Sequence, residues 1–163
     1  MKPEAAPQSV LAIDIGGTNV KVLASGQDRP RRIASGPKLT PNTMVALVKE
    51  LVADWEFDVI AVGYPGRVVD GRIVGDPRHL ATGWVGFDFA RAFDCPVRIV
   101  NDATLQALGS YRGGTMLFLG LVTGLGSALV ANGRKSPMLL NGGLHQIRFP
   151  CHCCFLASMA SVQ

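Results

Sequence analysis

Short apolar runs separated by glycine turns fill the first part of the chain. Apolar residues dominate Val10–Ile15 and Val20–Ala24, and β-branched residues are frequent in both runs. Together with Arg32–Ser35 they predict three neighbouring strands in an antiparallel meander, because each run is short and is bounded by turn residues. Gly16 and Gly17 stand in the first of these turns.

A helical pattern follows the meander. Thr40 is a favourable N-cap and Pro41 a favourable first helical residue, because both have the geometry that a helix start needs. Apolar residues then recur at helical spacing, which predicts that one face of the helix is buried. These residues are Met44, Leu47, Val48, Leu51, Val52 and Trp55.

Strands and helices alternate over the next part of the chain. Val59–Val62 is short and entirely apolar, which predicts a central strand covered on both faces. After it we expect a hairpin at Val68–Val69 and Ile73–Val74, a helix at Phe87–Phe93, a strand at Val97–Val100 and a helix at Ala103–Tyr111. This order is typical of an α/β protein with a mixed sheet and flanking helices.

A second glycine turn lies between two further strand-like runs. Met116–Val122 and Ala128–Ala131 flank the turn Thr123–Ser127. Glycine lets backbone N–H groups approach an anion closely, because it has no Cβ. Two such turns predict a clamp on a polyphosphate group. Each leads into a strand instead of a helix, which argues against the dinucleotide fingerprint and the Walker loop.

Composition and charge narrow the class of protein. Of the 163 residues 48% are hydrophobic and 17% charged, which is typical of a globular protein. The net charge of +4 is modest, and the group Arg29, Arg31 and Arg32 has no interleaved aromatic residues. We therefore expect a solvated turn there and no nucleic-acid partner.

No apolar run reaches membrane-spanning length, so we expect no membrane partner and, by default, a cytoplasmic protein. Residues 1–9 are expected to form a disordered tail.

Asp14 is a carboxylate inside an apolar strand, between Ile13 and Ile15. Burying it without a partner costs several kcal/mol, so the glycine turn beside it or a bound metal is expected to compensate. The structural alternative is that Asp14 only caps the turn between two strands. Lys21, just past the turn, either offsets phosphate charge or is simply solvated.

The pair Asn101 and Asp102 ends one strand and opens the next helix. Ligands of open α/β sheets bind beyond the carboxyl ends of strands, so Asp102 is placed to accept a proton from a substrate hydroxyl and Asn101 to orient that hydroxyl. Asn and Asp are also common N-caps, and in isolation capping is the stronger interpretation.

Gly66 and Trp84 are weaker candidates. The segment containing Gly66 follows a buried strand and either presents backbone amides to a substrate or forms a plain turn. Trp84 either walls a sugar site by stacking or belongs to the core, and a lone tryptophan more often belongs to the core.

Taken together, these segments resemble the ROK sugar kinases of the actin/hexokinase superfamily, particularly the polyphosphate glucokinase branch. The segment Ala12–Lys21 is similar to the first phosphate motif of that family. Later motifs are matched in the right order by Pro65–Val68, Trp84–Gly86, Val100–Ala103 and Val122–Ala128. The resemblance implies an actin/hexokinase-like (ribonuclease H-like) domain followed by the first strands of a second such domain.

The resemblance also implies a role for each matching residue. Asp102 matches the catalytic base that deprotonates the sugar 6-hydroxyl, and Asn101 and Gly66 match sugar-binding positions. Asp14 matches the carboxylate that organises Mg²⁺, directly or through water. The phosphate-binding positions are matched by Gly16, Gly17, Thr18 and Lys21 at the first turn and by Thr123, Gly124 and Gly126 at the second.

The implied domain organisation is incomplete. We expect a first actin-like ATPase domain at residues 10–113, the start of a second domain at 114–135 and an atypical tail at 136–163. Kinases of this type are longer and close two domains around their substrates, so turnover by this chain is expected to be impaired. The tail is interpreted as a frameshifted or prematurely ended version of the usual continuation.

Histidines and cysteines mark where the chain departs from the family. His79 stands where the family usually offers an asparagine to the sugar, and His145 either is a displaced sugar-binding histidine or is unrelated to it. Many ROK members have a zinc site. Its ligands are here imitated by His145, Cys151, Cys153 and Cys154. Two of these cysteines are adjacent and no glycine knuckle follows, so zinc is not expected.

The function that these residues predict is phosphoryl transfer from ATP or polyphosphate to the 6-hydroxyl of glucose or a related hexose, with Mg²⁺ as cofactor. The expected partners are therefore a small sugar and a phosphoryl donor, and a homodimer is one way to cover an exposed face. The alternative is a non-catalytic sugar- or phosphate-binding remnant or regulator of the same superfamily.

Overall fold

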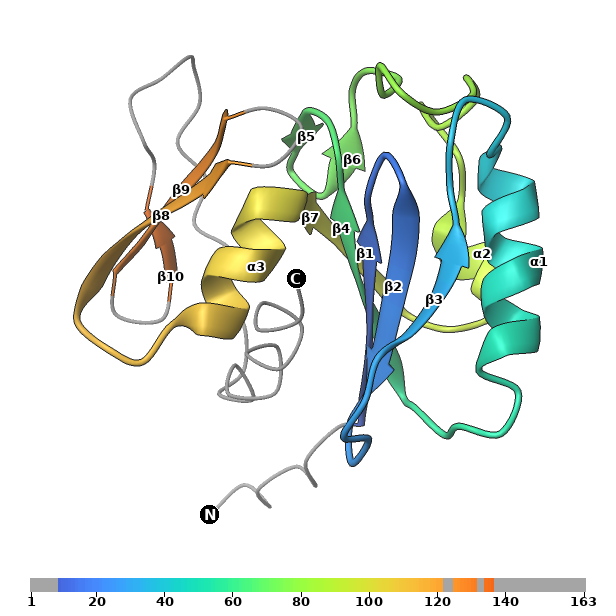
Figure 1. Ribbon diagram of the computed structural model, residues 1–163, viewed down its shortest axis with the longest axis horizontal. Helices are drawn as coiled ribbons and strands as arrows, with labels where there is room; N and C mark the ends of the chain where they lie inside the picture. Colours follow the sequence, from blue (N-terminus) through green and yellow to red (C-terminus); the bar gives the residue numbers. More distant parts are fainter. Residues whose placement is uncertain (1–8, 122–124, 132–133, 137–163) are drawn as a thin grey trace.

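The computed structural model describes residues 9–121, 125–131 and 134–136 (Figure 1). Its strands are β1 Val10–Ile15, β2 Asn19–Ala24, β3 Arg31–Ala34, β4 Val59–Tyr64, β5 Val68–Val69, β6 Arg72–Ile73, β7 Val97–Asn101, β8 Thr115–Leu121, β9 Leu125–Ala131 and β10 Arg134–Ser136. Its helices are α1 Pro41–Leu51, α2 Phe89–Phe93 and α3 Asp102–Ser110. The predicted mixed sheet with flanking helices is confirmed.

A five-stranded sheet in the order β3-β2-β1-β4-β7 forms the larger layer. The strands β1, β2 and β3 pair antiparallel, which confirms the predicted meander. The strands β1, β4 and β7 pair parallel to one another. The carboxyl ends of these three strands therefore meet at one edge of the sheet.

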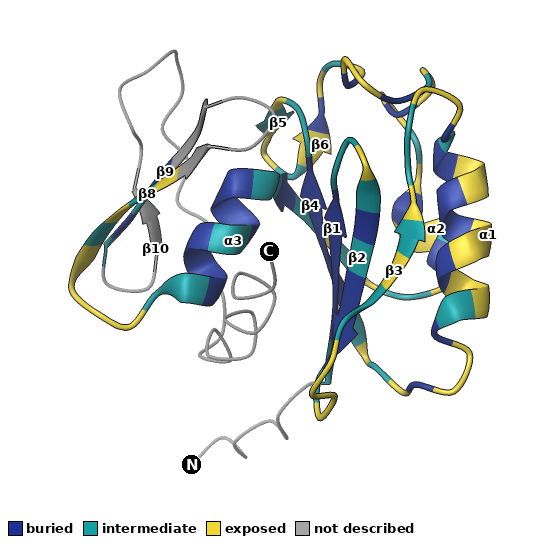
Figure 2. Cartoon of the chain, viewed as in Figure 1, coloured by how far each residue is buried: buried dark blue, intermediate teal, exposed yellow. Residues whose placement is uncertain are grey.

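The two faces of this sheet are covered differently. Alternate residues of a strand point to opposite faces, and Leu11, Ile13 and Ile15 pack in the main core with buried residues of α1. Asp14 therefore lies on the opposite face, where α3 packs against β4 (Figure 2). Chain order and register thus place one carboxylate on the α3 side of a largely apolar strand.

Helix α1 begins as predicted. The Thr40 side chain accepts a hydrogen bond from the Thr43 backbone N–H, and Pro41 is the first helical residue. Met44 and Val48 are buried, but Leu47 is 36% exposed, so its predicted place on the buried face is wrong. Each residue turns roughly 100° about the helix axis, and Leu47 lies at the margin of the stripe centred near Val48.

Two local contacts differ from the predicted pattern. Helix α2 begins at Phe89 and not at Phe87, because the Asp88 carboxylate caps it by accepting from the Arg91 backbone N–H at 3.0 Å. Arg31 is not simply solvated: it pairs with Asp54, and its guanidinium carbon lies 4.2 Å from the centre of the Trp55 ring. The predicted hairpin β5–β6 is confirmed.

A second sheet in the order β10-β9-β8 follows α3. In the β8–β9 hairpin Leu121 pairs with Leu125 and Gly120 with Gly126. Gly126 and its neighbours Leu125 and Ser127 therefore belong to strand β9, which corrects the longer turn that the sequence predicts. The division of the chain at residues 113 and 114 into two domains stays a prediction.

Helix α3 contacts both sheets (Figure 1). One side packs on β4, where Leu105 clusters with Ala61 and Val100. The other side buries Ala107 and Leu108 against the β8–β9 hairpin. Within the described ranges, no helix is both long and apolar enough to cross a bilayer.

Candidate active site

Three predicted segments meet at the carboxyl edge of the parallel strands. Asp14 pairs in register with Gly63, Gly63 with Val100, and Tyr64 with Asn101. The first glycine turn follows β1, the segment with Gly66 follows β4, and Asp102 follows β7. The edge thus brings together residues that are distant in sequence, as expected of ligand sites in open α/β sheets.

The first glycine turn is closed by its own backbone. The Gly16 N–H donates to the Asn19 carbonyl at 3.0 Å, and the Ser35 hydroxyl donates to the Gly16 carbonyl at 2.6 Å. A Cβ at Gly16 would lie 2.8 Å from the Asn19 carbonyl oxygen, so only glycine fits there. The N–H of Gly16 is committed inside the turn.

His79 lies against the same turn. Its Cβ is 3.5 Å from the position that a Cβ at Gly17 would take, and the side chain is exposed. The structure therefore brings His79 beside the first glycine turn, although the sequence relates it only to the sugar.

Asn101 has the geometry of a helix cap. Its Oδ1 accepts from the Ala103 N–H at 3.1 Å, and its Nδ2 donates to the Gly66 carbonyl at 3.1 Å. The capping interpretation is therefore confirmed, and the same side chain ties α3 to the segment after β4. A Cβ at Gly66 would lie 2.6 Å from the Tyr64 ring, which explains the glycine.

Asp102 is the first residue of α3 and is half-buried. Its Oδ1 accepts a hydrogen bond from the Ala103 N–H at 2.7 Å. Burial raises the pKa of the Asp102 carboxyl above its usual value, while hydrogen bonds to it act in the opposite direction. A carboxylate with a raised pKa binds a proton more readily, as a general base requires.

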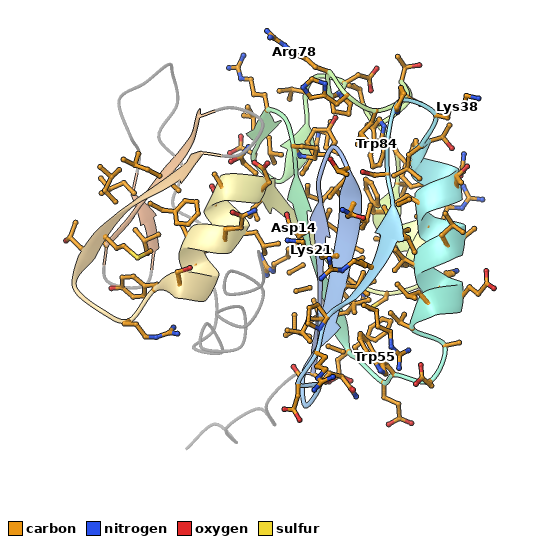
Figure 3. All side chains as sticks on the ribbon, in the orientation of Figure 1. Asp14, Lys21, Lys38, Trp55, Arg78 and Trp84 are labelled. Carbon is orange, nitrogen blue, oxygen red and sulfur yellow. The ribbon has the colours of Figure 1, made fainter. Side chains whose placement is uncertain are left out.

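Asp14 is 9% exposed, and Lys21 is its direct cross-strand neighbour (Figure 3). Burial raises the pKa of Asp14 to about 6, and the negative charge of Asp102 acts in the same direction. The charge of Lys21 and a hydrogen bond from Gln106 act against this shift. Lys21 and Gln106 thus partly stabilise the buried charge of Asp14. The sequence analysis expected the glycine turn or a metal to do so.

Gln106 is a site residue that the sequence analysis missed. Its Nε2 donates to Asp14 Oδ2 at 3.3 Å. The available signal was its position four residues after Asp102, which places both side chains on one face of α3. Its partner on β1 is 92 residues away in sequence, so only the folded arrangement reveals the contact.

The buried carboxylate of Asp14 suits a hard cation. The charge of Asp102 raises the cost of ionising Asp14, and Mg²⁺ is usually bound by one or two carboxylates together with water and substrate phosphates. In the described part of the chain, no cluster of three or more His, Cys, Asp or Glu side chains is arranged to hold a metal ion. The donors present therefore fit a magnesium ion shared with a phosphorylated ligand.

Trp84 belongs to the core. It is fully buried, its Nε1 donates to the Ala81 carbonyl at 2.7 Å, and its ring lies 5.8 Å from that of Tyr64. The alternative that Trp84 walls a sugar site is therefore wrong.

Several predicted site residues belong to the segments that the structure does not describe. Thr123, Gly124 and His145 lie outside the described residues, as do the cysteines of the tail. Gly126 is described through its backbone pairing in β9.

Comparisons with known proteins show which family the chain resembles. A model of the ROK family matches residues 10–138. The bifunctional enzyme NanE/NanK of Brucella melitensis is 34% identical over 80% of this chain, which corresponds to 28% of that enzyme. N-acetylmannosamine kinase of Escherichia fergusonii is 29% identical over 77% of this chain and 48% of that protein. The chain thus spans about half the length of that kinase and a smaller share of the bifunctional enzyme.

A solved structure shows the same fold. The ROK family glucokinase of Streptomyces griseus, in complex with glucose and AMPPNP, superposes with a TM-score of 0.63 at 22% identity. The match covers 78% of this chain and 46% of that glucokinase. The expected actin/hexokinase-like fold is therefore confirmed.

Proposed function

The chain belongs to the ROK family, and on that premise we propose that it carries the phosphoryl-transfer site of a sugar kinase. The proposed reaction moves a phosphoryl group from ATP or polyphosphate to the 6-hydroxyl of glucose or a related hexose in the cytoplasm. The observation that carries the proposal is the position of Asp102, half-buried at the carboxyl edge and within electrostatic reach of Asp14.

Asp102 is the proposed general base. It follows β7 directly and lies in the first turn of α3, where the helix dipole stabilises its negative charge. Burial raises its pKa, which favours proton uptake from a hydroxyl during attack. The proton of the sugar hydroxyl would pass to the Asp102 carboxylate as the oxygen attacks the terminal phosphorus. The bond from this phosphorus to the bridging oxygen of the donor would break, releasing ADP or a polyphosphate shortened by one unit.

The first glycine turn is the proposed contact for the phosphoryl donor. Because the Gly16 N–H is used within the turn, we assign the phosphate contacts to the N–H groups of Gly17 and Thr18. Lys21 supplies positive charge on the same side of the sheet as Asp14. Mg²⁺, held by Asp14 directly or through water, would neutralise charge on the transferred group. We extend the phosphate site to Thr123, Gly124 and Gly126 of the β8–β9 hairpin by the family resemblance alone.

The sugar is proposed to lie between Asp102, Asn101 and the Gly66 segment. Asn101 still has a second amide proton after its bond to the Gly66 carbonyl, and this proton is available for a sugar oxygen. His79 is proposed to reach the sugar from the other side of the glycine turn. The names of the relatives refer to two different sugars, N-acetylmannosamine and glucose. Binding of each sugar to this chain distinguishes between them.

The first experiment measures sugar binding and phosphoryl transfer by the 163-residue chain. Calorimetry with glucose and N-acetylmannosamine gives the affinity, and a radiolabelled assay with ATP or polyphosphate and Mg²⁺ gives the transfer rate. Because the chain spans about half the length of the curated kinase it matches, we expect the rate to be low. Sugar binding without transfer from either donor would favour the non-catalytic binding module instead.

Asp102→Asn tests the general base. Removing a general base typically lowers the rate by about 10²- to 10⁴-fold, whereas sugar binding should change much less because Asn still hydrogen-bonds a hydroxyl. The matched control is Asp88→Asn, since Asp88 caps α2 outside the site and Asn is an equally good cap. Equal transfer rates in the two variants would show that Asp102 is not the general base.

A further inference from the structure

Gln106 lies on the same face of α3 as Asp102, one turn further along the helix. The position of α3 on the sheet is fixed by close packing: a Cβ at Gly63 would lie 2.7 Å from Leu105 Cδ2 and 3.4 Å from the Asp102 Cα. Gly63 is the register partner of Asp14 on the neighbouring strand. The missing side chain of Gly63 therefore lets α3 come close enough for its polar face to reach Asp14.

The contact between Gln106 and Asp14 joins an amide donor to a carboxylate acceptor. Gln106 Nε2 donates to Asp14 Oδ2 at 3.3 Å, and both side chains are at least partly buried. A hydrogen bond to an ionised carboxylate is stronger than one between neutral groups. The bond therefore restrains the orientation of the Asp14 carboxylate relative to α3.

The chemistry of an amide suits this task. A cationic side chain in this place would neutralise Asp14 and compete with a metal ion for it. The uncharged amide of Gln106 occupies one lone pair of Oδ2 and leaves the negative charge and the remaining lone pairs to other ligands. Lys21 acts on Asp14 from the neighbouring strand β2, so the carboxylate is approached by a charge from one side and by a fixed donor from the other.

We infer that Gln106 is a positioning residue: it holds the Asp14 carboxylate in the orientation that binds the divalent cation, and it fixes this orientation relative to Asp102 on the same helix. This inference rests on the proposed function, because it assigns Gln106 to the metal-binding carboxylate of that site. Residues that orient a metal ligand typically change metal affinity by about 10- to 100-fold when they are removed.

The test compares Gln106→Met with the wild-type 163-residue chain. Methionine has nearly the same length and helix propensity as glutamine but cannot donate a hydrogen bond. Mn²⁺ serves as the probe, and its binding is followed by electron paramagnetic resonance of the free ion. We expect Gln106→Met to weaken Mn²⁺ binding about tenfold and to shift the carbonyl ¹³C resonance of the Asp14 side chain. A single cooperative urea unfolding transition shows that the variant is folded, although the lost hydrogen bond to a buried carboxylate lowers its stability.

Two further variants separate the possible failures. Gln27→Leu removes an exposed glutamine in the turn after β2 and should leave both measurements unchanged. Asp14→Asn should abolish the Mn²⁺ site. If Asp14→Asn weakens binding but Gln106→Met does not, the positioning role is refuted and the proposed function stands. If the wild-type chain binds no Mn²⁺, or Asp14→Asn binds it normally, the metal role of Asp14 fails and the inference falls with it.

Discussion

At the scale of single residues, Asp14 combines an unfavourable place in the fold with a proposed role in the site. Burial in an apolar strand raises its pKa to about 6 from the usual value of 3.8. A folded-state pKa above the unfolded value means that the native state binds the proton more tightly. Ionised Asp14 therefore costs stability, and this cost develops as the pH rises from about 4 to above 6.

Asp14→Asn should therefore stabilise the protein in a pH-dependent way. At pH 8 we expect the variant to exceed the wild type in free energy of unfolding by about 2 to 3 kcal/mol, since one pKa unit corresponds to about 1.4 kcal/mol. Near pH 4 the difference should nearly vanish, because Asp14 is then protonated in the folded state. Urea unfolding at several pH values measures this, with the exposed Asp28→Asn as a control for surface charge. A gap that stays constant with pH would show that the ionisation of Asp14 is not its cause.

The sequence predicted some site residues and missed others for identifiable reasons. Asp14 was predicted because a carboxylate between apolar residues of a strand needs a partner, and its two apolar neighbours are adjacent in the sequence. Gln106 was missed because its partner lies 92 residues away, and helical spacing relates it only to Asp102. Asn101 fitted two interpretations, and its hydrogen bond to the Gly66 carbonyl shows that the cap also ties α3 to the segment after β4.

At the scale of elements, the close approach of α3 to β4 determines where Asp102 lies. Gly63 permits this approach, because any side chain there would meet Leu105 and the backbone of Asp102. Glycine is needed at position 63 for lack of space and not for its backbone conformation, since Gly63 is not among the residues with a positive φ angle.

Gly63→Ala should displace α3 and destabilise the protein. An extra methyl group in a well-packed interior typically costs about 1 to 3 kcal/mol. Urea unfolding measures this cost, and sugar binding should weaken in parallel because Asp102 moves with the helix. Gly75→Ala is the matched control, since nothing lies within 4 Å of a Cβ at Gly75. Similar unfolding curves for the two variants would show that α3 adjusts without cost.

Elements with local determinants were predicted well, whereas the bounds of the second glycine turn and the margin of the buried face of α1 were not. Helix α1 was recognised from its Thr40 cap and its apolar stripe, which are both encoded within the helix. The predicted second glycine turn included residues that belong to strand β9. Gly126 pairs with Gly120, and this cross-strand register cannot be read from the composition of the segment. Leu47 was misplaced because a residue at the edge of a stripe is buried only if a neighbour reaches it.

At the scale of the whole molecule, the second sheet leaves an apolar strand uncovered. Leu117 and Leu119 are 55% and 56% exposed, and as alternate residues of β8 they lie on one face. Among the described residues, strand β8 is also at the edge of its sheet, where backbone groups can accept another strand. This surface fits the predicted homodimer, which stays a prediction.

Replacing both leucines by threonine should reduce self-association of the chain. Threonine keeps a high strand propensity but removes most of the apolar surface. Analytical ultracentrifugation over a range of concentrations should show a shift towards the monomer for Leu117→Thr/Leu119→Thr. The control Val85→Thr changes a similarly exposed residue, 51% accessible, in the turn before α2. An unchanged association constant would place any interface elsewhere.

Because α3 buries residues on two sides, the two sheets cannot be separated by a simple cut between them. A fragment ending near residue 113 would keep Asp102 but would expose Ala107 and Leu108, which are buried against Ala128 and Val130 in the intact chain. Anyone transplanting the five-stranded sheet into a chimera would have to bring the β8–β9 hairpin with it, or redesign the outer flank of the helix. Evolutionary exchange of the carboxyl-terminal part of such a protein faces the same restriction.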